Sequence, residues 1–470
     1  MNIKEYQQFD ALGLAELVRN GETTPQELLH IAQSLAEDAQ ETVNATAHMD
    51  TTLGEQKISN NDQGIFYGVP FLIKELLSYP GLKTAMGSRL FAEYIPPHGS
   101  AYTDRIDASG LITFGNTTSS EFGLLGSTET LLHGTTRNPW HRDLSAAGSS
   151  GGSAAAVASG IVPMAHASDG GGSIRIPASV CGLFGLMPSA GRCVPAMENS
   201  GPFADLVMEH CVTKSVRDSA AFLSITEDKG MDSRKPKFSP LGFIKEPNTQ
   251  PLRIAVYTET MMGTEADAEI IRVIQQTSQL CQELGHKVVS IDGPKFDGKA
   301  ISLAFFTLAG FAMDQVTKMM EPMLQRSVNE NDLEPFTFQL IDWFRRLDAN
   351  AVQQAMDVLK TAAAQMIQFA SGYDVLLCPT LTSEPKRLGF LSPTLDRETL
   401  IERTEQYVGY TPIHNISGLC AMSVPLFVSK SGLPIGSHFA AKPGAEAILL
   451  NLAYQLEAAA PWVERLHNIQ

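Results

Sequence analysis

Two short glycine- and serine-rich segments constrain the fold of this chain more than any other feature. Residues 148–153 read GSSGGS, and residues 169–175 read DGGGSIR. Glycine lacks a Cβ atom, so such segments form tight turns and allow other backbone to approach closely. Three successive glycines can also direct their N–H groups toward one point and form an anion-binding nest. Short apolar runs alternate with glycine-rich turns over residues 64–225, which is typical of an α/β fold.

Ser173, Ser149 and Lys74 are candidates for acyl-transfer chemistry. Ser173 follows the triple glycine, whose N–H groups could stabilise a developing oxyanion, although a plain tight turn with an exposed serine is the alternative. Lys74 ends the apolar run GVPFLIK over residues 68–74. A lysine in this place is either solvated or buried, and burial would lower its pKa enough for a neutral amine to act as a base toward a serine. The sequence leaves both alternatives open.

The segment 148–153 precedes an alanine-rich run, residues 153–158, that is expected to be helical. A phosphate-binding loop would need Gly-Lys-Ser/Thr at this point, and no lysine is present. The pattern Gly148-x-Ser150-x-Gly152 also matches a nucleophile elbow, which must follow a buried strand. Residues 141–145 are polar, so the elbow interpretation is disfavoured.

Composition limits the class of protein and its partners. The chain has 470 residues, of which 43% are apolar and 18% charged, and its net charge of −16 disfavours nucleic acid and anionic membranes as partners. Its six cysteines include no C-x-x-C pair, and no histidines have zinc-site spacing, so we expect reduced, mostly buried thiols and no metal. No signal-peptide pattern and no apolar run of transmembrane length is evident, so a cytoplasmic protein is expected.

Periodicity predicts the remaining elements. Helices are expected within residues 10–47 and over 264–285, 300–325, 349–371 and 446–459, and strands over 252–257, 287–291, 373–377, 422–427 and 435–440. A polar, proline-bearing stretch, residues 226–250 with Lys235-Pro236, is expected to be a connecting loop. We therefore predict one domain over residues 1–470: N-terminal helices (1–60), a catalytic core (61–225), the connecting loop (226–250), and a second half of the sheet with C-terminal helices (251–470).

With these segments taken together, the chain closely resembles the amidase signature family over nearly its whole length. Further segments match the family's landmarks: CGLFGL (181–186), SVRD (215–218), DVLLCPT (374–380), NISG (415–418) and GLPIG (432–436). Within the family it is most similar to bacterial amidases of the 6-aminohexanoate cyclic-dimer hydrolase type. The resemblance implies an α/β fold with a large twisted mixed β-sheet covered on both faces by helices.

The resemblance also implies a Ser–cis-Ser–Lys triad that hydrolyses a carboxylic amide without metal or organic cofactor. Ser173 would be the nucleophile that forms an acyl-enzyme, Ser149 the proton relay after a cis peptide bond, and Lys74 the base. The oxyanion would be bound by backbone N–H groups of Gly170, Gly171, Gly172 and Ser173. Supporting hydrogen bonds would come from Ser150, Asp169 and Arg175.

Some positions depart from the family pattern or remain open. Gly170 stands where the family often has threonine, Met187 where lysine is common, and Thr118 where asparagine is usual. Thr118, Ser120 and Glu121 are predicted substrate-binding residues on this basis. His166 is expected to be a core histidine rather than a triad member. Five aromatic residues could line an acyl channel, but their helical spacing favours core packing: Phe305, Phe306, Phe311, Trp343 and Phe344.

Two other functions compete with a free-standing amidase. One is the glutaminase subunit of a tRNA-dependent amidotransferase, which the residues around Lys74 and at Thr118 fit less well. The other is a catalytically silent binding protein on the same scaffold, against which the three triad residues argue. The resemblance also implies a homodimer and a small-molecule amide as the binding partner.

Overall fold

The computed structural model describes residues 1–470 except 60–63, 197–200, 231–236, 468 and 470. Eleven strands form one sheet that combines both predicted halves of the chain, in the order β1-β3-β2-β8-β10-β9-β14-β15-β13-β11-β12. In that order the strands are Thr46–Met49, Ile112–Thr117, Pro70–Lys74, Met164–Asp169, Met208–Thr213, Phe184–Met187, Cys420–Val428, Pro434–Ala441, Val375–Pro379, Arg253–Val256 and Lys287–Ser290. Two small two-stranded sheets pair β4 (Glu129–Thr130) with β5 (Gly134–Thr135) and β6 (Arg137–Asn138) with β7 (His141–Ser145).

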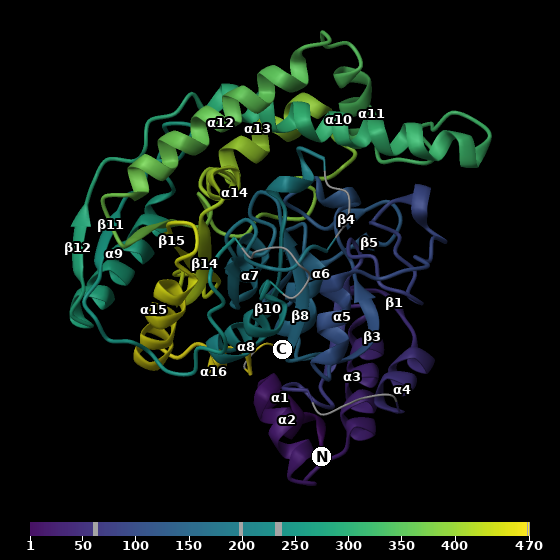
Figure 1. The fold of residues 1–470 in the computed structure, drawn as a ribbon, viewed down its shortest axis with the longest axis vertical. Helices are drawn as coiled ribbons and strands as arrows, with labels where there is room; N and C mark the ends of the chain where they lie inside the picture. The colour runs from purple at the N-terminus through teal and green to yellow at the C-terminus, as the bar shows by residue number, and fades with distance from the viewer. Residues whose placement is uncertain (60–63, 197–200, 231–236, 468, 470) are drawn as a thin grey trace.

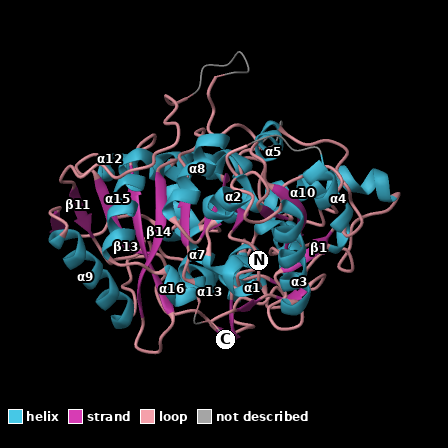
Figure 2. Cartoon of the chain, turned by 90° about the horizontal axis from the view of Figure 1, so that it is seen from below, coloured by secondary structure: helices cyan, strands magenta, loops and turns pink. Residues whose placement is uncertain are grey.

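Helices cover both faces of this sheet, as Figure 2 shows. In the first half they are α1 (Ile3–Gln8), α2 (Ala11–Arg19), α3 (Pro25–Ala39), α4 (Thr51–Ser59), α5 (Ala101–Ala108), α6 (Gly151–Ala158), α7 (Arg175–Cys181) and α8 (Val216–Thr226). In the second half they are α9 (Ala268–Glu283), α10 (Gly298–Leu324), α11 (Pro335–Phe344), α12 (Ala351–Ala370), α13 (Arg397–Tyr407), α14 (Pro412–Ser417), α15 (Glu446–Ala459) and α16 (Val463–Leu466). Short 3₁₀ turns lie at Arg89–Phe91, Glu121–Gly123 and Ala204–Leu206.

The sheet is mixed. β2 runs parallel to β3 and β8, and β11 runs parallel to β12 and β13, whereas the strands from β8 through β10, β9, β14 and β15 to β13 pair antiparallel. The predicted large mixed sheet with helices on both faces is therefore confirmed. Most periodic segments are also confirmed, among them the helix over 446–459 and the strands over 252–257 and 435–440.

Alternation of side chains along the strands produces two core layers. In β13, for example, Val375 and Leu377 pack in one apolar cluster with α8 and α15, while Leu376 and Cys378 pack in another with α12 and α14. All six cysteines are free, and five are buried, as expected. Residues 231–236 of the predicted connecting loop, including Lys235-Pro236, lie outside the described residues.

One helix departs from the sequence expectation. Helix α10 is 27 residues long and apolar enough to cross a membrane by length and composition, although no such run was expected. Of its most apolar window, 61% is buried inside the fold, as in the core helix of a globular protein. Its far end reaches away from the sheet at the upper right of Figure 1.

Candidate active site

Lys74 is fully buried at the end of β2, a strand whose residues are all buried and which lies between β3 and β8. Its Nζ lies 2.7 Å from Ser149 Oγ, 2.9 Å from Ser168 Oγ and 3.3 Å from the Ser168 carbonyl oxygen. A neutral amine retains a lone pair, so it can accept a proton from one of these hydroxyls. Of the two alternatives for this lysine, the structure has the buried one.

Burial lowers the pKa of Lys74 to about 7, because the charged form loses its hydration. The negative charges of Glu209, Asp169 and Glu75 act in the opposite direction and limit the shift. A base with a pKa near 7 is half deprotonated at neutral pH, which is where general-base catalysis is most effective.

Ser149 lies in the loop between β7 and α6, and its peptide bond to Gly148 is cis, as the resemblance implied. A Cβ at position 148 would lie 2.8 Å from the Leu125 carbonyl oxygen and the Ser127 backbone, so only glycine fits there. Thr128 Oγ1 binds the other side of the loop, donating to the Ala147 carbonyl at 2.9 Å and accepting from the Gly151 N–H at 3.1 Å. The loop is therefore fixed from both sides, which holds the Ser149 hydroxyl against Lys74.

Ser150 makes a separate contact, donating from Oγ to the Ser168 carbonyl at 3.2 Å. Its supporting role in catalysis stays a prediction. The strand before the loop, β7, pairs only with β6, and its first three residues are exposed. A strand is thus present where polar residues were expected, but it is not the buried strand that a nucleophile elbow requires.

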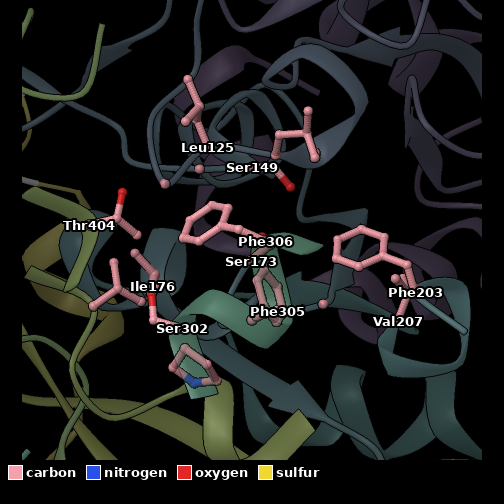
Figure 3. Close-up of a pocket in the computed structure, with 18 of the residues that line it drawn as sticks. Leu125, Ser149, Ser173, Ile176, Phe203, Val207, Ser302, Phe305, Phe306 and Thr404 are labelled. Atoms are coloured by element: carbon pink, nitrogen blue, oxygen red, sulfur yellow. The ribbon is translucent and has the colours of Figure 1, made fainter. Parts of the chain in front are cut away.

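Ser173 lies in the turn between β8 and α7, half-buried, and lines one pocket together with Ser149, Gly170 and Gly171. Figure 3 shows Ser149, Ser173, Phe305 and Phe306 around the same pocket. The predicted nucleophile and the predicted relay therefore border the same cavity, although they come from loops on different strands.

A buried ionic network holds this turn. Arg175 donates from Nε and Nη2 to the two carboxylate oxygens of Asp169, both at 2.9 Å, and from Nη2 to Asn415 Oδ1 at 2.6 Å. Asn415 Nδ2 donates in turn to the Asp169 carbonyl at 2.7 Å. Burial tends to raise the pKa of Asp169, but the charge and hydrogen bonds of Arg175 outweigh it and hold the pKa at about 2. Asp169 and Arg175 thus contact each other and Asn415, and their supporting role in catalysis stays a prediction.

One predicted oxyanion donor, the Gly172 N–H, is instead part of this network. The N–H of Gly172 donates to Asp169 Oδ1 at 2.6 Å, and Gly172 does not border the pocket. Its amide is therefore occupied by the carboxylate. Gly170, Gly171 and Ser173 border the pocket and stay predicted donors.

The pocket is small and apolar, with a volume of about 130 Å³. Phe305 and Phe306 of α10 line it; for Phe305 the expectation of core packing was wrong, whereas Phe306 borders both the pocket and the core. Among the described residues that line it, the one charged side chain is Glu405, which is paired with Lys299. Ser168, which contacts Lys74, was not among the predicted site residues, although a serine inside a fully buried strand indicates a buried polar contact.

The three predicted substrate-binding residues do not reach this pocket. All three are buried, and their side chains bond within the fold. Thr118 Oγ1 lies 2.6 Å from Thr136 Oγ1, Ser120 Oγ donates to the Leu125 carbonyl at 3.1 Å, and Glu121 accepts from Ser88 Oγ at 2.7 Å. These residues turn inward, whereas the next residues, Phe122–Leu125, line the pocket.

His166 is a core residue, as expected. It is fully buried; its Nδ1 accepts from the Lys74 backbone N–H at 3.3 Å, and its Nε2 lies 3.0 Å from Glu209 Oε2. Neither of these contacts involves a serine. In the described part of the chain, no group of three or more His, Cys, Asp or Glu side chains is placed to hold a metal ion.

Comparison with known proteins gives the class. The Amidase family profile matches residues 27–450, so the chain belongs to the amidase family, whose members hydrolyse carbon–nitrogen bonds of amides. A Mycobacterium tuberculosis protein provisionally named amidase AmiC is 34% identical over 460 residues, covering 97% of this chain and 96% of that protein. The 6-aminohexanoate-cyclic-dimer hydrolase of Paenarthrobacter ureafaciens is 31% identical, with 97% and 96% covered.

A solved structure agrees with the sequence relatives. A 6-aminohexanoate cyclic dimer hydrolase in complex with its substrate superposes with a TM-score of 0.89 at 29% identity, and the match covers 98% of each chain. The amidase signature fold is thereby confirmed, together with the resemblance to the cyclic-dimer hydrolase type. This chain is an amidase.

Proposed function

We propose that this amidase works through an acyl-enzyme on Ser173, with Ser149 as proton relay and Lys74 as base. The supporting observation is the contact of 2.7 Å between Lys74 Nζ and Ser149 Oγ, in a loop that borders the same pocket as Ser173. A buried amine whose pKa lies near 7 can take a proton through one hydroxyl from another.

In the first step Ser173 Oγ forms a bond to the amide carbonyl carbon. Its proton passes to Ser149 Oγ while the Ser149 proton passes to Lys74 Nζ, and the carbonyl electrons move to oxygen. Backbone N–H groups of Gly170, Gly171 and Ser173 stabilise this oxyanion, and each such donor is typically worth about 10²–10³ in rate.

In the second step the carbon–nitrogen bond breaks as the relay returns the proton to the leaving nitrogen, which departs as amine or ammonia. Water then attacks the acyl group on Ser173 with the same base. The products are a carboxylate and the regenerated serine, and no cofactor is needed for the proton or electron balance.

A glutaminase is less well supported than a free-standing amidase. Glutamine carries a carboxylate, which proteins usually bind with arginine or lysine. Among the described residues lining the pocket there is no arginine, lysine or histidine, and its one charged group is the carboxylate of Glu405. A silent binding protein is also disfavoured, because all three chemical groups are present and Lys74 contacts Ser149.

The test is hydrolysis of an aliphatic amide, an aryl anilide, a cyclic ω-amino-acid dimer and glutamine. The cyclic dimer is included because two of the relatives above act on such a compound by name. We expect turnover of at least one non-glutamine amide, lost by at least 10³-fold in Ser173→Ala and unchanged in Ser371→Ala, whose serine is exposed at the end of α12. Near-normal turnover by Ser173→Ala would refute the mechanism.

A fluorophosphonate probe gives an independent readout. We expect it to label Ser173 in the wild type and not in Ser173→Ala, with peptide mass spectrometry assigning the site. A protein that is folded but neither labelled nor active on any of the four substrates would favour the silent binding protein. Turnover of glutamine alone would favour the glutaminase.

A further inference from the structure

A second cavity, here called the α10 groove, lies next to the catalytic pocket. Leu76, Phe122, Ser168, Phe203 and Val207 line both cavities, so the two are adjacent. The volume of the groove is about 710 Å³, against about 130 Å³ for the pocket. Ligand sites commonly span roughly 300–1,000 Å³, so the pocket by itself is small for a substrate and the groove supplies the missing space.

The walls of the groove are apolar and partly exposed. Phe311, Val316 and Met320 of α10 line the groove together with Leu90 and Phe91. At the outer end Met319 and Met323, which also line the groove, are 59% and 71% exposed. Large exposed apolar side chains that gather in one place usually mark a binding site, and methionine adapts to ligands of varied shape.

The charges of the groove restrict what can bind. Of its described lining residues, two are charged, Glu93 and Glu209, and both are acidic. No lysine, arginine or histidine is among them. Glu93 is paired with Lys83, which is not a lining residue. A substrate tail that ends in a carboxylate would meet the Glu93 and Glu209 carboxylates with no cation among the described lining residues, whereas a neutral tail would meet apolar walls.

The position of the base indicates which part of the amide faces the groove. Ser168, whose hydroxyl and carbonyl contact Lys74 Nζ, lines both cavities, and Leu77, three residues after Lys74, lines the groove; Ser149, Gly170, Gly171 and Ser173 line only the pocket. In Figure 3, Phe203 and Val207 lie on one side of Ser173, and Thr404 and Ile176 lie on the other. In the proposed mechanism the proton returns from Lys74 through Ser149, so the leaving nitrogen is near Ser149 in the pocket, and a substituent that extends past Ser168 on the Lys74 side would enter the groove.

We propose that the α10 groove binds the amine portion of the substrate, and that this portion is a long apolar group without a carboxylate. The substrate class is then an N-substituted amide with an extended aliphatic or aromatic amine. This proposal rests on the proposed function, since it takes Ser173 and the Lys74–Ser149 pair as the reacting groups. The acyl portion occupies the small pocket.

The experiment compares two series of amides: N-alkyl acetamides from methyl to decyl, and N-methyl amides of acyl chains of the same lengths. Each buried methylene is worth about fourfold in affinity, so kcat/KM should rise about fourfold per methylene along the N-alkyl series until the chain outgrows the groove. Ala312 lines the groove but not the pocket, so Ala312→Trp should abolish this rise and leave N-methylacetamide turnover unchanged.

Ala364→Trp, on the exposed face of α12, is the matched control and should behave as the wild type. Val316→Glu is a second groove variant that adds a charge instead of bulk. A further substrate, an N-alkyl acetamide whose chain ends in a carboxylate, should be hydrolysed at least tenfold more slowly than its methyl-ended counterpart. N-methylacetamide turnover reports whether each variant is folded.

The proposal is overturned if kcat/KM does not depend on N-alkyl length, if Ala312→Trp slows all substrates equally, or if the acyl series responds instead. Any of these results leaves the amidase mechanism intact. Binding of N-decylacetamide to Ser173→Ala, measured by calorimetry, tests the groove even if no amide is hydrolysed. Binding that weakens at least tenfold on addition of Ala312→Trp supports the groove, and unchanged binding overturns it.

Discussion

Lys74 is a residue whose chemistry depends on burial rather than on its neighbours in sequence. Solvation would keep this amine charged at neutral pH, and the fully buried position holds its pKa at about 7. Three acidic groups, Glu209, Asp169 and Glu75, prevent a larger shift. This balance gives an amine that is both present as a free base and strong enough to accept a proton.

The first prediction concerns pH. In the proposed mechanism the neutral Lys74 amine is the active form, so kcat/KM should rise about tenfold per pH unit below pH 7 and level off above it. The measurement is a pH profile between pH 5 and 9 with a slow amide, for which chemistry is rate-limiting. Lys74→Met should have less than a thousandth of wild-type activity throughout. A flat wild-type profile would count against a lysine base.

Breaking the buried ion pair between Asp169 and Arg175 should lower the free energy of unfolding considerably. Both side chains are fully buried, so Asp169→Asn leaves the Arg175 guanidinium without its counter-charge. We expect a loss of about 3–5 kcal/mol in the free energy of unfolding, with activity lost as well because the turn that carries Ser173 loosens. Urea denaturation measures the first effect. Asp143→Asn, which breaks an exposed pair with Arg387, is the control and should change little.

The turn between β8 and α7 is the element that positions Ser173, the proposed nucleophile. Gly172 there has a φ of +128°, and a Cβ would lie 2.3 Å from Thr411 Oγ1 and 2.5 Å from Ile176 Cδ1. Any other residue at this position would therefore be strained by its φ and would displace the side chains of Thr411 and Ile176. Thr411 is itself held in place, because its hydroxyl donates to the Gly171 carbonyl at 2.7 Å.

A third prediction follows from this contact. Gly172→Ala should lower kcat at least 100-fold and destabilise the protein by about 1–3 kcal/mol, because the turn must shift around the new methyl group. Gly372→Ala is the matched control, since a Cβ at that position would meet no atom within 4 Å and its φ is not in the left-handed region. Equal behaviour of the two variants would show that the turn tolerates a side chain.

Across the whole molecule, buried polar contacts join segments that are distant in sequence. Arg192, which follows β9, donates from Nη2 to Glu446 Oε2 at 2.8 Å, and the Ser189 N–H donates to Glu446 Oε1 at 2.8 Å. Glu446 begins α15, so this pair connects the glycine-rich half of the sheet with the C-terminal helix. It lies outside the set of residues that line the catalytic pocket.

The fourth prediction is that Arg192→Ala costs about 3–5 kcal/mol in stability, because the Glu446 carboxylate is left buried without its partner. The KM of the folded enzyme should be unchanged, since neither residue borders the site. Thermal denaturation and steady-state kinetics test the two statements. Arg346→Ala, which removes an exposed pair with Asp342, should leave the melting temperature within a few degrees of the wild type.

Features that depend on local chemistry could be predicted from the amino-acid sequence alone. The glycine segments, Ser149, Ser173 and Lys74 could be recognised because turns and reactive groups are properties of single residues and their neighbours. Helices with an apolar stripe, such as α9 and α15, were likewise predictable. Helix α13 was not, because Leu400 and Tyr407 are its only described buried residues and they form no stripe.

The tertiary structure was needed to decide which residues of a helix or turn border the pocket. Thr118, Ser120 and Glu121 turn inward and Phe122–Leu125 turn toward the pocket, although all belong to one short segment. Phe305 borders the pocket instead of the core, and the Gly172 amide binds Asp169 instead of facing the pocket. Local sequence specifies the turn or the helix, but its orientation is set by contacts with residues more than a hundred positions away, such as Thr411 and Asn415.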